Sequence, residues 1–88
     1  MKREWKAEQS IQLENGETLE LDYWLLTEGT CWGDSYGISV TDSAGQEAAI
    51  QHITTRRDHA LELLHRMARG TVTTVTASDV VEDFLSTG

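Results

Sequence analysis

The sequence predicts an α+β fold: a four-stranded antiparallel meander followed by two helices that pack on one face of the sheet. Three observations predict it. Apolar and polar residues alternate through the first half of the chain, and short glycine-containing segments interrupt the alternation at hairpin spacing. After Thr54 the apolar spacing becomes helical. With 88 residues, no proline and no low-complexity linker, the chain is expected to form a single domain over residues 1–88.

The first predicted hairpin joins two alternating segments, residues 5–14 and 18–26. Between them, a three-residue loop, Glu14-Asn15-Gly16 with its glycine in the left-handed conformation, places Ile11 opposite Leu19 on a shared apolar side. A two-residue loop would mix the apolar side of one strand with the polar side of the other. We therefore expect the three-residue loop.

The second hairpin has a turn candidate at Glu28-Gly29. A two-residue loop there places Leu25 opposite Trp32, and the third strand then runs through Tyr36, Ile38 and Val40. The glycine-rich residues 31–35 are compatible with an extended strand, a bulge or a loop. The sequence leaves these three alternatives open.

The third hairpin loop is predicted at Ser43-Ala44-Gly45, again with glycine third. It makes residues 47–53 the fourth strand, with Ile50 opposite Ile38 and His52 opposite Tyr36. Alternation also puts Trp5 on the same side of the first strand as Ala7, toward the expected core.

Two helices are predicted after the sheet. Thr55 and Asp58 resemble a capping box, and Gly70 supplies a stop. Thr76 with Asp79 signals a second, terminal helix. The apolar stripes of the two helices contain Ala60, Leu61, Leu64, Met67 and Ala68, and then Val80, Val81, Phe84 and Leu85. Val72 and Val75 favour a short strand instead, but no strand is left to pair with them.

The charge balance limits the classes of partner. Fifteen acidic and seven basic residues give a net charge of -8, which repels phosphate backbones and anionic lipid headgroups. We expect no direct nucleic-acid binding and no membrane association. The single cysteine, Cys31, excludes an internal disulfide, and no signal peptide or membrane span is evident, so we expect a cytoplasmic protein. So small a core favours self-association.

Three segments carry a family resemblance. They are Tyr36-Gly37-Ile38, the helix after the fourth strand, and the closing Ser78-Asp79-Val80-Val81-Glu82-Asp83-Phe84-Leu85. In this order they resemble a family of small uncharacterised proteins of Gram-positive anaerobic bacteria, over roughly residues 19–86. The resemblance implies a bacterial cytosolic protein of unknown activity, and it transfers no catalytic residue.

Residue types with catalytic or metal-binding chemistry are present but poorly placed. A cysteine nucleophile needs a base within hydrogen-bond reach, and the predicted register turns Cys31 away from His52. His59 and His65 are six residues apart, which does not place them on one helix face. We therefore expect no catalytic residue, no metal and no cofactor.

An apolar patch is the most informative feature of the predicted sheet. The face opposite the helices carries Trp24 and Leu26 next to the acidic Glu20 and Asp22, where polar residues are the rule. We select Trp24 and Leu26 as interface candidates, and with them Trp32 and Trp5.

Three functions follow, in decreasing order of support. The first is a noncatalytic protein-interaction or regulatory domain that self-associates as a homodimer. The second is an acidic decoy that occupies the basic, nucleic-acid-binding surface of another protein. The third is a small enzyme that uses Cys31, His52 or Tyr36, and it requires two of these side chains in one concave site.

Overall fold

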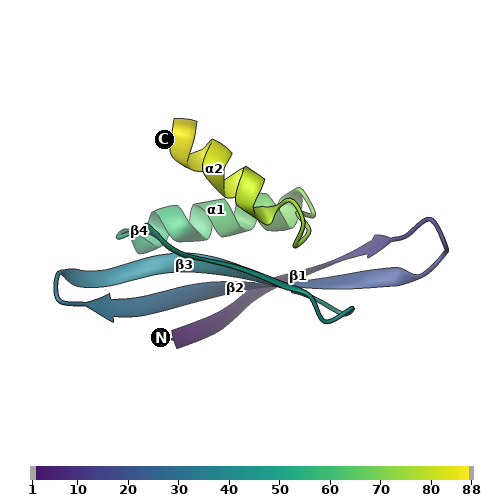
Figure 1. Ribbon diagram of the computed structural model, residues 1–88, viewed down its shortest axis with the longest axis horizontal. Helices are drawn as coiled ribbons and strands as arrows, with labels where there is room; N and C mark the ends of the chain where they lie inside the picture. Colours follow the sequence, from purple (N-terminus) through teal and green to yellow (C-terminus); the bar gives the residue numbers. More distant parts are fainter. Residues whose placement is uncertain (1, 88) are drawn as a thin grey trace.

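The structure is a computed structural model that describes residues 2–87; Met1 and Gly88, the ends of the expected 1–88 domain, lie outside the described residues. Its strands form one antiparallel sheet in the order β1-β2-β3-β4, and two helices follow. Both helices lie on the same side of the sheet (Figure 1), so the predicted α+β fold is confirmed. The elements are β1 Lys2–Gln12, β2 Thr18–Thr30, β3 Gly33–Asp42, β4 Glu47–Thr54, α1 Arg57–Arg69 and α2 Ala77–Thr87.

The first and third hairpins have the predicted three-residue loops. Ile11 pairs with Leu19 across β1 and β2, and Ile50 pairs with Ile38 across β3 and β4. Gly16 has a φ of 87° and donates its backbone N–H to the Leu13 carbonyl at 3.0 Å. A residue with a Cβ is strained at such a φ, so the glycine in the third loop position fixes the register.

The second hairpin turns later than predicted. Leu25 pairs with Ile38 instead of Trp32, and the last pair is Thr30 with Gly33, so the loop is Cys31-Trp32 instead of Glu28-Gly29. The prediction missed this because Glu28 and Gly29 continue β2 as ordinary strand residues. The displacement is an even number of positions, and each residue therefore keeps its predicted face of the sheet.

Bulges in both edge strands overturn two further predictions. Lys6 is an extra residue between the pairs Trp5–Trp24 and Ala7–Tyr23, so Trp5 lies on the face away from the helices. In β4, residues 51–53 lie opposite Gly37 alone, so Tyr36 pairs with Thr54 and not with the predicted His52. Such bulges also interrupt an exposed sheet edge and disfavour pairing with another chain.

The helix α1 begins one residue later than its sequence signal, whereas α2 begins directly after its predicted cap, Thr76. Arg56, not Thr55, is the N-cap of α1, and it makes no side-chain capping hydrogen bond; Asp58 still lies in the first turn. The helix ends at Gly70 as predicted, although the left-handed residue is the next one, Thr71, with a φ of 52°. Val72 and Val75 lie in the connection between α1 and α2, which contains no strand.

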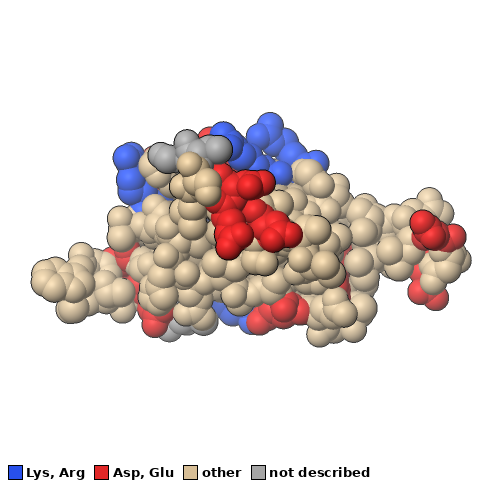
Figure 2. All heavy atoms as spheres, turned by 45° about the horizontal axis from the view of Figure 1, so that its top comes forward, with Lys and Arg blue, Asp and Glu red and all other residues tan. Residues whose placement is uncertain are grey.

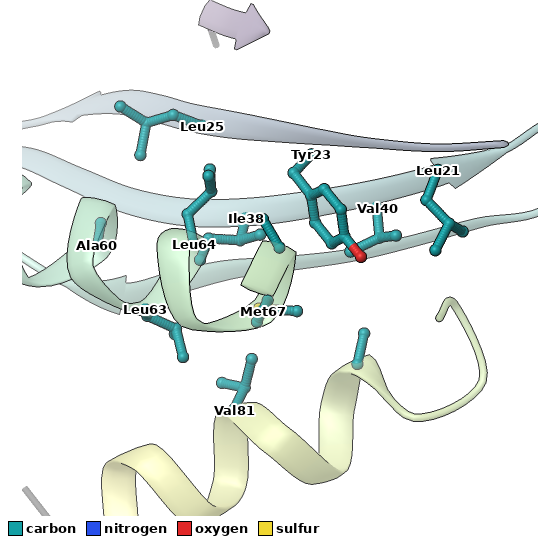
Figure 3. Packing of buried hydrophobic residues seen from close by; sticks show 12 residues of the cluster. Leu21, Tyr23, Leu25, Ile38, Val40, Ala60, Leu63, Leu64, Met67 and Val81 are labelled. Carbon is teal, nitrogen blue, oxygen red and sulfur yellow. The ribbon is translucent and has the colours of Figure 1, made fainter. Parts of the chain in front are cut away.

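The core lies between the helices and the apolar face of the sheet (Figure 3). Leu21, Tyr23 and Leu25 of β2 are fully buried against α1 and β3. The Tyr23 hydroxyl donates a 2.7 Å hydrogen bond to the Val72 carbonyl, which fixes the connection between the two helices to the sheet. Burial raises the pKa of Tyr23 to about 12 because it penalises the phenolate.

Candidate functional site

The open face of the sheet, the face that the helices leave uncovered, carries two of the predicted interface residues side by side. Trp5 of β1 pairs with Trp24 of β2 because the Lys6 bulge reverses the face of the first strand. The Trp5 indole N–H donates to Asp22 at 3.0 Å, and the Trp24 indole N–H donates to Thr41 at 3.0 Å. The indole N–H of each ring is thus bonded to a polar neighbour within the sheet.

The Arg3 side chain closes the middle of this face. Its guanidinium carbon lies 4.8 Å from the centroid of the Trp24 ring, and the same group forms a 3.3 Å ion pair with Glu47. Arg3 and Glu47 belong to β1 and β4, the two edge strands of the sheet. The ion pair therefore joins opposite edges of the sheet across the Trp24 ring.

As a consequence, little of the predicted patch is accessible. Leu26 is only 3% exposed and Ser39, which pairs with Trp24, is 1% exposed, although no helix covers either of them. The expectation of an exposed Trp24 and Leu26 patch is corrected: Leu26 is buried and Trp24 is half-buried. The sequence could not show this, because Arg3 lies over the Trp24 ring only in the folded sheet.

The β2–β3 turn presents the most exposed large apolar side chain of the described residues. Trp32 is 94% exposed, whereas Trp5 is 51% exposed. The turn is ordered by Thr30, whose hydroxyl accepts the Trp32 backbone N–H and donates to the Gly33 carbonyl. This hairpin extends past the helices at one end of a molecule with extents of 47 × 27 × 16 Å (Figure 1). Cys31, a free and exposed thiol, lies beside Trp32.

The three residues considered for catalysis are not brought together. Tyr36 packs against the core on the helix side, Cys31 lies in the turn, and His52 has moved to the open face in the β4 bulge. His52 instead contacts Ser35, with Nδ1 3.1 Å from Oγ, and Glu28, with Nε2 3.1 Å from Oε2.

A hydroxyl, an imidazole and a carboxylate in a row are the components of an activated serine. Here, however, the His52 and Glu28 side chains are 55% and 41% exposed, and Glu28 Oε2 makes no directional hydrogen bond among the described residues. Oε2 itself is shielded from water, but the two side chains are otherwise open to solvent, whereas nucleophile activation depends on an enclosed, preorganised site. We interpret the row as a polar link that holds the bulged β4 edge to β2 and β3.

A hollow between the helices is a feature that the sequence did not indicate. It measures about 370 Å³ and lies between α1 and α2 at the end of β4. The Arg66 guanidinium lies 5.6 Å from the centroid of the Phe84 ring and pairs with Glu62 at 2.8 Å. Leu85, which was predicted to be part of the buried stripe of α2, is 54% exposed at its wall. The hollow is lined principally by Ile53, His59, Glu62, Arg66, Phe84 and Leu85.

The helical spacing of His59, Glu62 and Arg66 accounts for one wall of this hollow but does not reveal the hollow itself. These residues occur at positions i, i+3 and i+7, which places them along one face of α1. His65 lies outside this set and is exposed. Within residues 2–87, no group of three His, Cys, Asp or Glu side chains is arranged to hold a metal ion.

The family model for a family of unknown function, DUF6514, matches residues 2–87. The chain belongs to this family. The match includes β1 and the first hairpin, which the sequence resemblance did not cover, so the Trp5 and Arg3 positions of this DUF6514 chain lie within the family's model. No curated protein and no solved structure shows a significant match.

Charges are segregated on this DUF6514 chain. Residues 55–70 contain four arginines and only two acids, in a chain with a net charge of -8. Figure 2 shows basic side chains along the top of the molecule, an acidic cluster in front of them, and more acidic atoms at the right-hand end, where Figure 1 shows the β1–β2 hairpin. The helix α1 therefore forms a basic surface on an acidic protein.

A smaller ionic cluster ties β1 to α1. The Glu4 carboxylate lies 3.0 Å from the Lys6 ammonium, 3.3 Å from the Arg57 guanidinium and 3.5 Å from the Lys2 ammonium. The hydrogen bond from Lys6, with smaller contributions from the other two cations, holds the pKa of Glu4 below its usual value.

Among the described residues no helix is long and apolar enough to cross a membrane.

Proposed function

We propose that the chain is a noncatalytic protein-interaction domain whose recognition element is the β2–β3 turn with Trp32. The observation that carries this proposal is the 94% exposure of Trp32 on an ordered, protruding hairpin. Tryptophan is enriched among the residues that dominate binding energies, because it buries a large apolar area with few rotatable bonds. The other two tryptophans bond within the sheet, so they contribute less to a surface for partners.

The tip is suited to insertion into a pocket of another protein. A two-residue turn and the hydrogen bond of the Trp32 backbone N–H to Thr30 order the backbone of the tip, so binding has to immobilise only the indole side chain. The bulges at Lys6 and in β4 make edge-to-edge strand pairing the less favourable mode of association. The proposed setting is the bacterial cytosol that the sequence resemblance implies.

Affinity capture with immobilised protein tests the proposal. Wild-type protein and the variants Trp32→Ser and Trp5→Ser are exposed to a lysate of the source organism, and the retained proteins are identified by mass spectrometry. We expect proteins that wild type and Trp5→Ser retain and that Trp32→Ser loses, because only the last variant lacks the tip. Equal retention by all three proteins, including copies of the chain itself, would refute the role of the tip.

A second candidate, the acidic decoy, is favoured by the acidic end of the molecule. Glu14 and Glu17 are exposed at the β1–β2 hairpin, and Glu8 and Glu20 line a hollow of about 200 Å³ on the adjoining strands. A basic partner held there would dissociate as salt rises, because exposed ion pairs are screened. Capture that depends on Glu14 and Glu17 and disappears in high salt would support the decoy; capture that is indifferent to salt would exclude it.

A further inference from the structure

We propose that the partner of the Trp32 tip is a second copy of this chain, and that the indole of each copy enters the hollow between α1 and α2 of the other. This inference rests on the proposed function, because it takes the tip as the recognition element and names its partner. The resulting assembly is a dimer with two equivalent contacts.

The hollow has the size and the chemistry that an indole requires. Its volume of about 370 Å³ lies in the range of ligand pockets, about 300–1,000 Å³. Ile53, Phe84 and Leu85 supply apolar walls, and Leu85 is 54% exposed, so an incoming ring would remove apolar surface from water. These features suit a single aromatic side chain.

The polar groups of the hollow complement the rest of the indole. The Arg66 guanidinium already lies against the Phe84 ring and can stack on a second aromatic ring. The Glu62 carboxylate, 2.8 Å from Arg66, is an acceptor for the indole N–H. In the isolated chain the Trp32 indole N–H makes no hydrogen bond to any described residue.

Charge complementarity with α1 favours a second copy as the occupant. Residues 27–35 of the tip contain Glu28 and Asp34 and no lysine or arginine. Of the two helices that border the hollow, α1 belongs to residues 55–70, which contain four arginines and two acids, whereas α2 contains three acids and no lysine or arginine. A tip that reaches the hollow along its α1 side thus brings acidic residues to the basic part of an otherwise acidic protein, which opposes the repulsion between two chains of charge -8.

The positions of tip and hollow allow the exchange to be reciprocal. The β2–β3 turn, the start of α1 and the end of α2 lie at the same end of the molecule (Figure 1). A two-fold axis between two such ends brings each tip to the other copy's hollow, and the assembly then closes as a dimer instead of growing into a filament.

Sedimentation of the purified chain between micromolar and submillimolar concentrations tests the proposal. We expect a monomer–dimer equilibrium whose dissociation constant rises about thirtyfold or more in Trp32→Ser, because a central tryptophan anchor is lost. Leu85→Glu, which places a charge on the wall of the hollow, should have the same effect. Val75→Glu is its matched control, since Val75 is 77% exposed and does not line the hollow, and this variant should dimerise like wild type.

Mixing the two defective variants separates a lost contact from a misfolded chain. Trp32→Ser keeps its hollow and Leu85→Glu keeps its tip, so an equimolar mixture should form a heterodimer with one intact contact, weaker than the wild-type dimer. A wild-type chain that stays monomeric, a dimer that Trp32→Ser leaves unchanged, or a mixture that stays monomeric would each overturn the proposal. If the chain is monomeric but still captures another protein through Trp32, only the proposal that the partner is a second copy is overturned, and the proposed function stands.

Discussion

The two faces of the sheet bury their side chains by different means. On the helix side, Leu25 and its neighbours are enclosed by the rigid helix α1 and the adjoining strands. On the open face, Leu26 is buried almost as completely, but no helix covers it, and the nearby Trp24 is covered by the long side chain of Arg3. Two side chains with the same exposed fraction can therefore be surrounded by groups of different stiffness. The loss in free energy of unfolding when such a side chain is truncated depends on whether the walls of the new cavity can collapse.

Leu25 and Leu26 are consecutive residues on opposite faces and provide the strongest test of this comparison. Leu25→Ala should lower the free energy of unfolding by about 3–4 kcal/mol, because packed helices cannot follow the lost atoms. Leu26→Ala should cost about 1–2 kcal/mol, since flexible side chains and water can fill the space. Urea unfolding followed by circular dichroism measures both. Equal losses would show that the open face is as rigid as the core.

Gly37 tests the backbone contact below the β4 bulge. A Cβ at this position would collide with the Ile50 carbonyl oxygen and come within 2.8 Å of the Gln51 Cα. Gly37→Ala should therefore cost about 2 kcal/mol or more, because β3 and β4 must separate. Gly29→Ala is the matched control, since its Cβ would meet only Asp34 Oδ1 at 3.8 Å. A Gly37→Ala protein as stable as this control would contradict the close approach.

The Tyr23 hydroxyl tests the polar anchor within the helix-covered core. Tyr23→Phe should cost about 1–2 kcal/mol, because the Val72 carbonyl loses its 2.7 Å hydrogen bond. Tyr36→Phe is the control and should change little, since the Tyr36 hydroxyl makes no hydrogen bond within residues 2–87. Thermal or urea unfolding at neutral pH is sufficient to distinguish the two.

The same residue predicts how stability falls in alkali. The pKa of Tyr23 is raised to about 12 in the fold from an ordinary value of 10.0. The contribution of its neutral phenol to the free energy of unfolding is therefore fully present below pH 10. Between pH 10 and about 12 the unfolded chain loses the phenolic proton first, and the free energy of unfolding decreases. Tyr23→Phe should lose less stability than wild type across this window. Parallel stability curves would contradict a buried, neutral phenol.

Arg3 should produce the smallest effect. Arg3→Ala removes the contact with Trp24 and the ion pair with Glu47, whose side chains are 43% and 48% exposed, so a loss of about 0.5–1 kcal/mol is expected. Glu47→Gln should cause only the part of this stability loss that comes from the ion pair, which is the part that high salt screens. The tryptophan emission of Arg3→Ala should shift to longer wavelength as Trp24 becomes wetter. An unchanged spectrum would mean that Arg3 does not cover the ring.

The sequence predicted much of the fold but misjudged which tryptophan is exposed. Period-two alternation and the loop glycines gave the strands, the outer hairpin registers and the face of most residues. Glu28-Gly29 was preferred as a turn because glycine favours turns, yet both residues are accommodated in β2, and the turn moved to Cys31-Trp32. Because the sequence left residues 31–35 open between a strand, a bulge and a loop, it did not predict the exposed position of Trp32 at the tip.

The hydrophobic pattern by itself determined the helix-covered core, because period two and helical spacing each fix which side chains of an element point together. Only the tertiary structure decided the open face. Three features depend on residues that are far apart in the sequence. They are the Lys6 bulge that turns Trp5 outward, the ion pair between Arg3 on β1 and Glu47 on β4, and the hollow beside Arg66. Such contacts depend on how the sheet and helices meet in space, which local spacing does not encode.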